Sequence, residues 1–383
     1  MSAAAEAPAT IVGTVTESRA LDERAFFAWL VVDRSLAGPH AAGERVAIAW
    51  DERVSDRGRR FADGQRILVA LEPLPTWSIW RERLGEQDAL GIALRGEAFL
   101  TAPDAATVDG VAAWLARPAP GRASVAALPE LAALVAGAEP TVAKGALDRI
   151  AALPGLAAAL DAPGGGAALA SLRGALRDAD RPERLRAALL ALAGQRGLEA
   201  FAPELAALAG DAASGLAPDA IAAWAALPGG LPRADAARLL ASSDPAVRAA
   251  VLSHAAGALD DATIEARLGG DPAPAVRAAA VAAWVARRGM DAWPKVAPRL
   301  DDPNAPEGAA AVRALGALGE PAVVPLATRA RERELDGARG PMLALTFAGP
   351  QGVVALRALA ADHPDPAARA LATFLLGRPP AAH

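Results

Sequence analysis

Histidine and cysteine are frequent nucleophiles, general bases and metal ligands, and this chain holds few of them. It has no cysteine and four histidines, His40, His254, His363 and His383. No two histidines stand four residues apart, so the spacing of a helical zinc site is absent. Ser253 and His254 are adjacent, and neighbouring helical residues point about 100° apart, which rules out a Ser–His relay from this pair alone. The sequence predicts no catalytic residue, no metal and no cofactor, and His254 is expected to pack between repeats.

Other chemical motifs in the sequence also have simpler structural explanations. The glycine run at 164–166 lacks the Gly-Lys-Ser/Thr that completes a phosphate-binding loop. Two pairs of acids, Asp260-Asp261 and Asp301-Asp302, lie where a turn meets a predicted helix. Carboxylates are favoured at helix N-termini, so we expect these acids to cap helices.

Two segments near the start of the chain combine arginine with aromatic rings, a composition that can bind single-stranded nucleic acid by stacking. However, residues 1–117 carry 13 arginines and 17 acids, which argues against binding to a phosphate backbone. We therefore expect a partner-binding anchor here, or a contact between two parts of the chain. The candidate partner-binding residues are Arg57, Arg59, Arg60, Trp77, Trp80 and Arg81.

The first part of the chain alternates apolar and polar residues with a period of two, which predicts β-strands. Five short strands followed by one helix, at 105–116, favour a small barrel, because closure removes exposed sheet edges. The predicted strands cover residues 11–16, 26–32, 45–50, 66–71 and 92–100.

The turns and strands of this part resemble an OB-type barrel of the netrin-like family. The likeness rests on Gly-Thr-Val at 13–15, Leu-Ala-Gly-Pro at 36–39, Gly-Glu-Arg-Val at 43–46 and the strand that follows Phe61. Many netrin-like domains are secreted and contain cysteines, and this chain departs from them because it has none. The resemblance implies an accessory binding module.

The later part of the chain repeats one phrase. Residues 244–251 and 271–280 both place Asp-Pro before an Ala-rich run that contains Val-Arg. Asp caps a helix and Pro suits its first turn, so each copy predicts a helix start. A third copy, after Asp302, departs from the phrase, with Glu307 and Gly308 where Val and Arg stand. A repeat of about thirty residues is typical of a solenoid of helix pairs.

These repeats resemble HEAT repeats of the kind found in phycobilisome (PBS) lyases. The likeness rests on Asp-Pro-x-Val-Arg in both copies and on the Ala-Leu-Gly to Val-Val-Pro-Leu stretch at 314–326. It implies an α-solenoid whose second helices line an inner surface, with Asp capping its own helix and Arg bonding between repeats. The residues expected to have structural roles in the repeats are Asp244, Arg248, Asp271, Arg277 and Trp284.

The sequence therefore predicts a multi-domain α+β protein, an OB-like β-barrel followed by an all-α HEAT-like solenoid. We expect the barrel with its helix at 1–117, a linker at 118–122, the solenoid at 123–377 and a tail at 378–383. The predicted function is that of a non-enzymatic scaffold or adaptor that binds a protein or peptide partner on the solenoid. A bilin-lyase-like factor that modifies another protein is the first alternative. Single-stranded nucleic-acid binding through the barrel is the second.

Composition and charge limit the class of protein further. The net charge is −5, and lysine occurs only at 144 and 295 among otherwise arginine cations, which is typical of a GC-rich, bacterial-type genome. No apolar run is long enough to predict a membrane span. The start of the sequence lacks the basic and apolar regions of a secretory signal, which predicts a cytoplasmic protein. A periplasmic or secreted location is the alternative if this start is a processed form.

Overall fold

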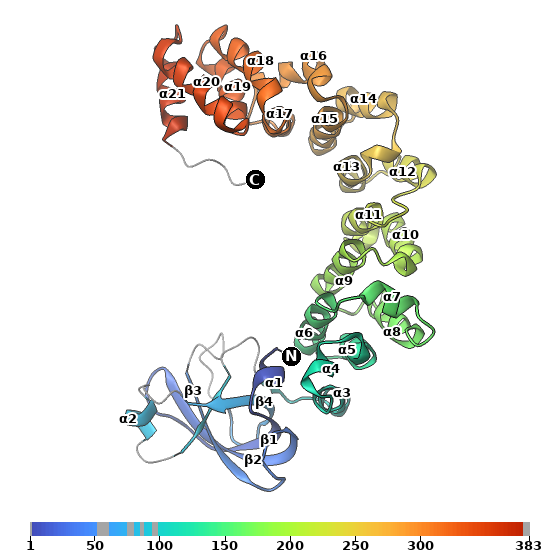
Figure 1. The fold of residues 1–383 in the computed structure, drawn as a ribbon, viewed down its shortest axis with the longest axis vertical. Coiled ribbons are helices and arrows are strands. Elements are labelled where there is room, and N and C mark those ends of the chain that lie inside the picture. The colour runs from blue at the N-terminus through green and yellow to red at the C-terminus, as the bar shows by residue number, and fades with distance from the viewer. Residues whose placement is uncertain (1, 52–60, 75–79, 85–87, 94–98, 378–383) are drawn as a thin grey trace. The chain divides into compact units, whose positions relative to one another are not determined.

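The structure is a computed structural model that describes residues 2–51, 61–74, 80–84, 88–93 and 99–377. The chain forms two compact units, Met1–Glu204 and Leu205–His383. The first unit contains a β-barrel followed by helices, and the described part of the second contains helices alone (Figure 1). This arrangement confirms the predicted multi-domain α+β layout. The linker predicted at 118–122 stays a prediction, and Ala119–Arg122 form a short helix there.

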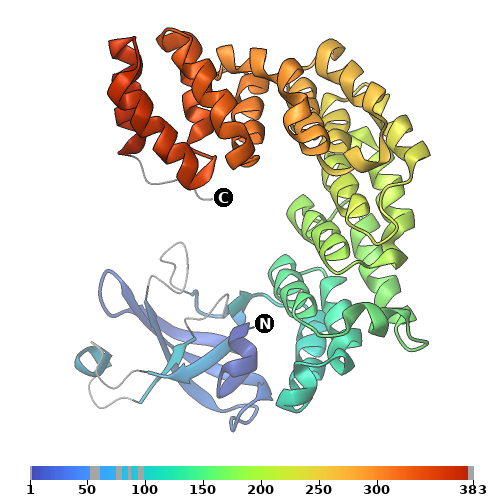
Figure 2. The same cartoon turned by 45° about the horizontal axis from the view of Figure 1, so that its top comes forward.

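Six strands build the sheet of the first unit, and five of them close into a barrel (Figure 2). Their order is β1-β2-β3-β5-β4, and antiparallel pairing of β1 with β4 closes the ring, which agrees with the predicted OB-like barrel. The remaining strand, β6, adds to β4. The strands are β1 (Ala9–Ala20), β2 (Ala25–Ala37), β3 (Arg45–Asp51), β4 (Arg66–Pro73), β5 (Leu90–Ile92) and β6 (Phe99–Thr101).

The barrel interior is filled by alternate residues of each strand. Ile11, Leu30, Ile48 and Val69 are completely buried there. Trp50 closes the interior beside them, stacked on Phe26 at 5.7 Å between ring centroids. Because side chains of a strand alternate between faces, the predicted period-two pattern directs these residues inward.

The fifth predicted strand, 92–100, is wrong as a single strand. Ile92 pairs with Leu71 of β4, whereas Phe99 pairs with Val69. Ile92 and Phe99 are seven residues apart, but their partners on β4 are only two residues apart. One continuous strand therefore cannot cover this range. The strand is divided into β5 and β6, and residues 94–98 lie outside the described part of the chain.

Helices make up most of the remaining described chain. In the first unit, α1 precedes the barrel, α2 lies between β4 and β5, and α3–α9 follow β6; α10 contains the division between the units, and α11–α21 belong to the second. The helices are α1 (Ser2–Glu6), α2 (Trp80–Leu84), α3 (Ala105–Leu115), α4 (Ala119–Arg122), α5 (Leu128–Val135), α6 (Pro140–Ala151), α7 (Leu156–Asp161), α8 (Gly166–Arg177), α9 (Glu183–Gln195), α10 (Ala202–Gly210), α11 (Ala217–Ala225), α12 (Arg233–Leu240), α13 (Pro245–His254), α14 (Asp261–Gly270), α15 (Pro274–Arg288), α16 (Trp293–Val296), α17 (Pro306–Ala317), α18 (Glu320–Arg331), α19 (Leu335–Leu345), α20 (Gly349–Asp362) and α21 (Pro366–Leu376).

The helices of the second unit follow one another in chain order. The odd-numbered helices from α11 to α21 each pack on the next, which forms one layer, and α18 packs on α20 in the other layer (Figure 1). Links such as α14 with α15 and α20 with α21 join the layers. Each helix therefore buries its apolar face against neighbours in sequence, as in a solenoid.

Two helices of this unit begin at the Asp-Pro pair predicted from the sequence. The Asp244 carboxylate accepts from the Ala246 N–H at 2.8 Å and begins α13 at Pro245. Asp365 does the same for α21 through the Ala367 N–H, also at 2.8 Å. Of the paired acids, Asp260 caps α14 through the Thr263 N–H as expected. The prediction is wrong for Asp301-Asp302, because α17 begins only at Pro306, after Ala305 and without a side-chain cap.

Two glycines allow helices to approach very closely. A Cβ built on Gly308 of α17 stands 1.8 Å from the Asp302 carbonyl oxygen, and one on Gly340 of α19 stands 1.9 Å from the Leu300 carbonyl oxygen. Real Cβ atoms do not come so near to oxygen, so both positions need glycine. Helix α17 begins at Pro306, which places Gly308 at the third helical position, where α13 carries Val247. Counted from the helix start, the predicted alignment of Glu307 with Val and of Gly308 with Arg is therefore wrong by one residue.

The close approach at Gly340 predicts a stability effect. We expect Gly340→Ala to lower the free energy of unfolding by about 1–3 kcal/mol, because the added methyl group must displace the backbone near Leu300. Gly269 of α14 is the matched control, since a Cβ there meets nothing within 4 Å; Gly269→Ala is expected to stabilise by up to about 1 kcal/mol. Urea unfolding followed by circular dichroism measures both changes, and equal effects of the two substitutions would contradict the packing argument.

Candidate functional site

The predicted surface residues are only partly within the described chain. Arg57, Arg59, Arg60 and Trp77 lie outside the described residues, and of Arg81 the structure describes only the backbone, in α2. Trp80 is described and is 8% exposed. Its ring packs on the outside of the barrel and is not an open stacking platform for a base.

A small apolar cluster on the outer face of the barrel explains the burial of Trp80. Ala25 of β2 and Ala49 of β3 point outward and leave room for the indole ring. Leu74 and Leu84 pack around the same cluster. Helix α2 is held further by an ion pair between Arg83 and Asp22. Helix α2 therefore covers one end of the β2–β3 face.

Beside α2 lies a groove of about 660 Å³, which is the candidate binding site of the barrel. Six segments border it: the start of β1, the middle of β2, the β2–β3 turn with the first half of β3, the end of β4, α2 and the start of β5. Trp29, Leu74, Trp80, Leu84 and Leu90 form apolar walls. The volume is in the range of ligand and peptide pockets.

The groove opens where two neighbouring strands separate. Parallel pairing of β3 with β5 covers only Ile48 with Leu90 and Ala49 with Gly91. The preceding residues of β3, Arg45–Ala47, pair with β2 on their other side. The groove lies beside this short β3–β5 ladder.

A histidine and a carboxylate stand at one end of the groove. His40 Nδ1 lies 2.8 Å from Glu44 Oε1, and the Ala41 N–H donates to Glu44 Oε2 at 2.9 Å. The hydrogen bond from His40, followed by that from Ala41, holds the pKa of the Glu44 carboxyl below its usual value. Because a carboxylate only accepts, Nδ1 carries the hydrogen of this bond.

An arginine covers the aromatic ring in the groove. The Arg45 guanidinium lies 4.7 Å from the centroid of Trp29, a cation–π distance. The same guanidinium forms an ion pair with Glu17 at 2.8 Å. The charge of Arg45 is therefore already balanced.

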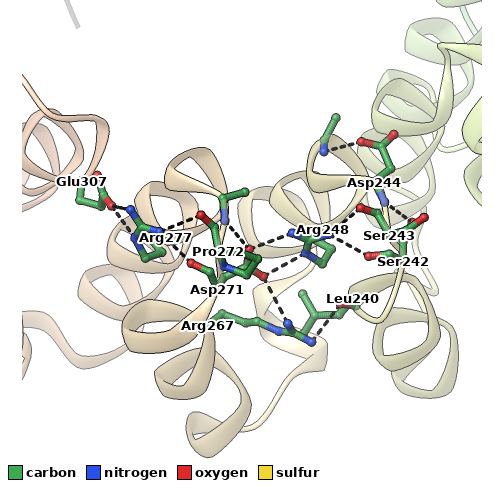
Figure 3. A network of polar contacts seen from close by, with 12 residues as sticks. Leu240, Ser242, Ser243, Asp244, Arg248, Arg267, Asp271, Pro272, Arg277 and Glu307 are labelled. Carbon is green, nitrogen blue, oxygen red and sulfur yellow. Dashed lines mark hydrogen bonds and ion pairs between the residues drawn. The ribbon is translucent and has the colours of Figure 1, made fainter.

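Four of the repeat residues predicted from the sequence, Asp244, Arg248, Asp271 and Arg277, lie in one network in the second unit (Figure 3). Arg248 of α13 donates twice to Asp271, at 2.9 Å to Oδ2 and 2.8 Å to Oδ1. It also donates to the carbonyl oxygens of Ser242 and Ser243. Arg267 joins Asp271 to the Leu240 carbonyl oxygen. Arg248 and Asp271 are both buried, so this pair links successive repeats from within.

The next repeat continues the network with different residues. Arg277 of α15 donates to the carbonyl oxygens of Asp271 and Pro272 and reaches Glu307 of α17 at 2.5 Å (Figure 3). Glu307, the residue that departs from the repeated phrase, thus accepts the bond from the previous repeat. Trp284 of α15 is 5% exposed, and the cations of Arg288 and Lys295 lie over its ring.

Arginines elsewhere reach the carbonyl groups at helix ends. Arg181 donates to three carbonyl oxygens after α5, and Arg196 donates to two at the end of α6. In the second unit, Arg299 does the same for Leu268 of α14. The last carbonyls of a helix have no partner within it, so these bonds satisfy them.

The histidine prediction needs correction. His254 is exposed and does not pack between repeats. The buried histidine is His363, whose Nε2 lies 2.9 Å from the Ala330 carbonyl oxygen and whose Nδ1 accepts from the Asp365 N–H at 3.0 Å. Its place just before the Asp-Pro of the last repeat was the signal that could have identified it.

Comparisons with known proteins leave the family open. The chain matches no family model, and no curated protein is significantly similar to it in sequence. None of the helices in the described part of the chain has the length and apolar character needed to cross a membrane. Within that same part, no three side chains of His, Cys, Asp or Glu are grouped as metal ligands would be.

The buried pair of Arg248 and Asp271 predicts a large stability effect. Arg248→Met should lower the free energy of unfolding by up to about 3–5 kcal/mol, because it removes the two bonds from Arg248 to a buried carboxylate and leaves only Arg267 as its cation. The double change Arg248→Met with Asp271→Leu should recover part of this loss, since no charge then stays buried. Arg233→Met is the control; its pair with Asp260 is exposed, and no measurable change is expected. A double variant as unstable as Arg248→Met would contradict the argument.

Acid should weaken the same contact. The side-chain hydrogen bond from Arg248 is the main cause that holds the pKa of Asp271 below its usual value. A lowered pKa stabilises the fold above the unfolded value of about 3.9 and ceases to do so as the pH falls through the folded pKa. The difference in unfolding free energy between the wild type and Asp271→Asn should therefore shrink below about pH 4. Urea unfolding from pH 7 to pH 3 measures it, with Asp219→Asn as the exposed control; a constant difference would refute the prediction.

Proposed function

We propose that this protein is a non-enzymatic adaptor that binds a protein or peptide partner on its helical repeats, with the barrel as an accessory binding module. The observation that carries the proposal is the two-layered order of the second unit, in which each helix packs on neighbours in sequence. Such an array exposes long helical layers without requiring one catalytic centre, and binding along a layer is its common use.

The repeat contacts support assigning these helices to the HEAT type. Asp244 caps its own helix, and Arg248 bonds to Asp271 of the next repeat, which are the roles that the resemblance implies. The barrel order supports an OB-type module, and the netrin-like likeness belongs to the same proposal.

The layer that contains α15 and α17 is the better surface for a partner. Ala282 of α15 and Arg313 of α17 are exposed on it. Arg313, and Arg339 of α19, have no charged or hydrogen-bonded partner in the described part of the chain. Small side chains with free arginines offer a surface on which a partner can lie closely and form new ion pairs.

Nucleic acid is the weaker candidate ligand. The barrel part carries more acids than arginines, and Trp80 is buried against the barrel rather than presented for stacking. Both observations disfavour binding to a single strand, which requires a positive groove and open aromatic rings.

Site-specific photo-crosslinking in the native host tests the adaptor function. A photo-reactive side chain at Ala282 or Arg313 is expected to capture one polypeptide. The same group at Val324 of α18 or Val354 of α20, which are 73% and 56% exposed on the other layer, should not capture it. Capture of nucleic acid alone, or no capture from either layer, would overturn the proposal. A covalent modification of the captured polypeptide that depends on this protein would favour the bilin-lyase-like alternative instead.

A further inference from the structure

We propose that this protein associates with a second copy of itself through the layer that contains α18 and α20. This layer is opposite the one proposed for the partner, so self-association does not rest on the adaptor function. Three features of the layer lead to it: two exposed valines at equivalent positions of packed helices, an unpaired acid beside one of them and an unpaired arginine beside the other.

Two exposed valines form an apolar ridge on this layer. The described chain exposes four large apolar side chains, and two of them, Val324 at 73% and Val354 at 56%, lie in α18 and α20. These two helices pack on each other (Figure 1). Val324 follows the buried Ala322 by two residues and Val354 follows the buried Gly352 by two, so the valines occupy equivalent places. Since packed helix axes lie about 8–10 Å apart, Val324 and Val354 form one valine ridge.

One charge of each sign flanks the valine ridge. Glu320 lies one helical turn before the valine of α18, and Arg357 lies about one turn after the valine of α20, so each shares an exposed helix face with its valine. Both side chains are exposed, and neither has a charged or hydrogen-bonded partner in the part of the chain that the structure describes. A second molecule that covers the ridge can therefore form new ion pairs at both places.

The flanked ridge is complementary to itself. Helices α18 and α20 run in the same direction, because α19 returns the chain between them. The acid therefore lies towards the N-terminal end of one helix, and the arginine lies towards the C-terminal end of the other. A two-fold axis through the middle of the ridge places each Val324 on the Val354 of the second copy and each Glu320 on its Arg357. Two-fold contacts of this kind are the commonest way in which identical chains associate.

The contact is expected to be weak. Two valines on each copy cover less area than a permanent interface needs, so monomers and dimers should exchange as the concentration changes. The layer that contains α15 and α17 takes no part in this contact. A dimer would therefore offer two partner surfaces, which raises the apparent affinity for a partner that itself has two copies of its binding segment.

Charge exchange tests the pairing, with sedimentation velocity of the full chain at increasing concentration as the measurement. Glu320→Arg and Arg357→Glu should each weaken self-association at least about five-fold, because each variant places like charges opposite one another. An equimolar mixture of the two variants should associate again, since every pair in the mixed dimer then has opposite charges. A wild type that stays monomeric at every concentration, or a mixture that associates no better than either variant alone, would overturn the proposal.

A charge placed on the ridge gives a second test. Val354→Arg should weaken self-association at least about ten-fold, because the guanidinium would lose its water against the valine of the second copy. Val125→Arg is the matched control, since Val125 is an exposed valine of the first unit and lies outside the ridge. Circular dichroism shows whether both variants keep the helical content of the wild type. Equal association of the two folded variants would refute the inference.

Self-association and the adaptor function fail in different ways. A polypeptide captured at Ala282 by a chain that stays monomeric removes self-association and leaves the adaptor function. A chain that dimerises through the ridge but captures nothing at Ala282 removes the adaptor function as stated and leaves self-association. A photo-reactive group at Val354 is expected to capture a second copy of this chain, which mass spectrometry distinguishes from any other polypeptide.

Discussion

Arginine side chains that reach from one repeat into the next are the interaction on which the helical part of this protein depends. The helices are rich in alanine, which buries little area and allows neighbouring helices to slide. A guanidinium carries five donors in a fixed plane, so it can bond at once to a carboxylate and to helix-end carbonyls. Arg248 does both, and Arg181 satisfies three carbonyls after α5. These bonds fix the relative positions of neighbouring helices, which the small side chains alone do not determine.

Much of the helical part could be predicted because its signals are local. Asp-Pro sits at or shortly before a helix start, and α13 begins directly at Pro245 as expected. The need for glycine at 340 could not be predicted, because it depends on a carbonyl oxygen forty residues earlier in the chain. Helix α7 carries no such signal, because it follows Gly155 and has no side-chain cap. The division of β5 from β6 was missed because both pair with β4 and only the register separates them.

The groove was less accessible to sequence reasoning, because its walls come from six separate segments. Trp80 was identified as a candidate anchor, and it does line the groove, but from within an apolar cluster. Its burial depends on Ala25 and Ala49, whose outward positions leave a space that the indole ring fills. The sequence contains no signal that places His40 and Asp88 at the groove, because a position in a loop does not reveal which other segments lie beside it.

The short reach of the contacts between repeats has a consequence for synthesis of the chain. Arg248 bonds to a residue 23 positions later, and Arg277 to one 30 positions later. The barrel, in contrast, closes only when Ala9 meets Leu71. Because closing short loops costs little entropy, each helix pair can dock soon after it leaves the ribosome. The barrel can close only after its fourth strand has been synthesised. The repeats that follow can assemble as they are translated, and they therefore expose little apolar surface to chaperones.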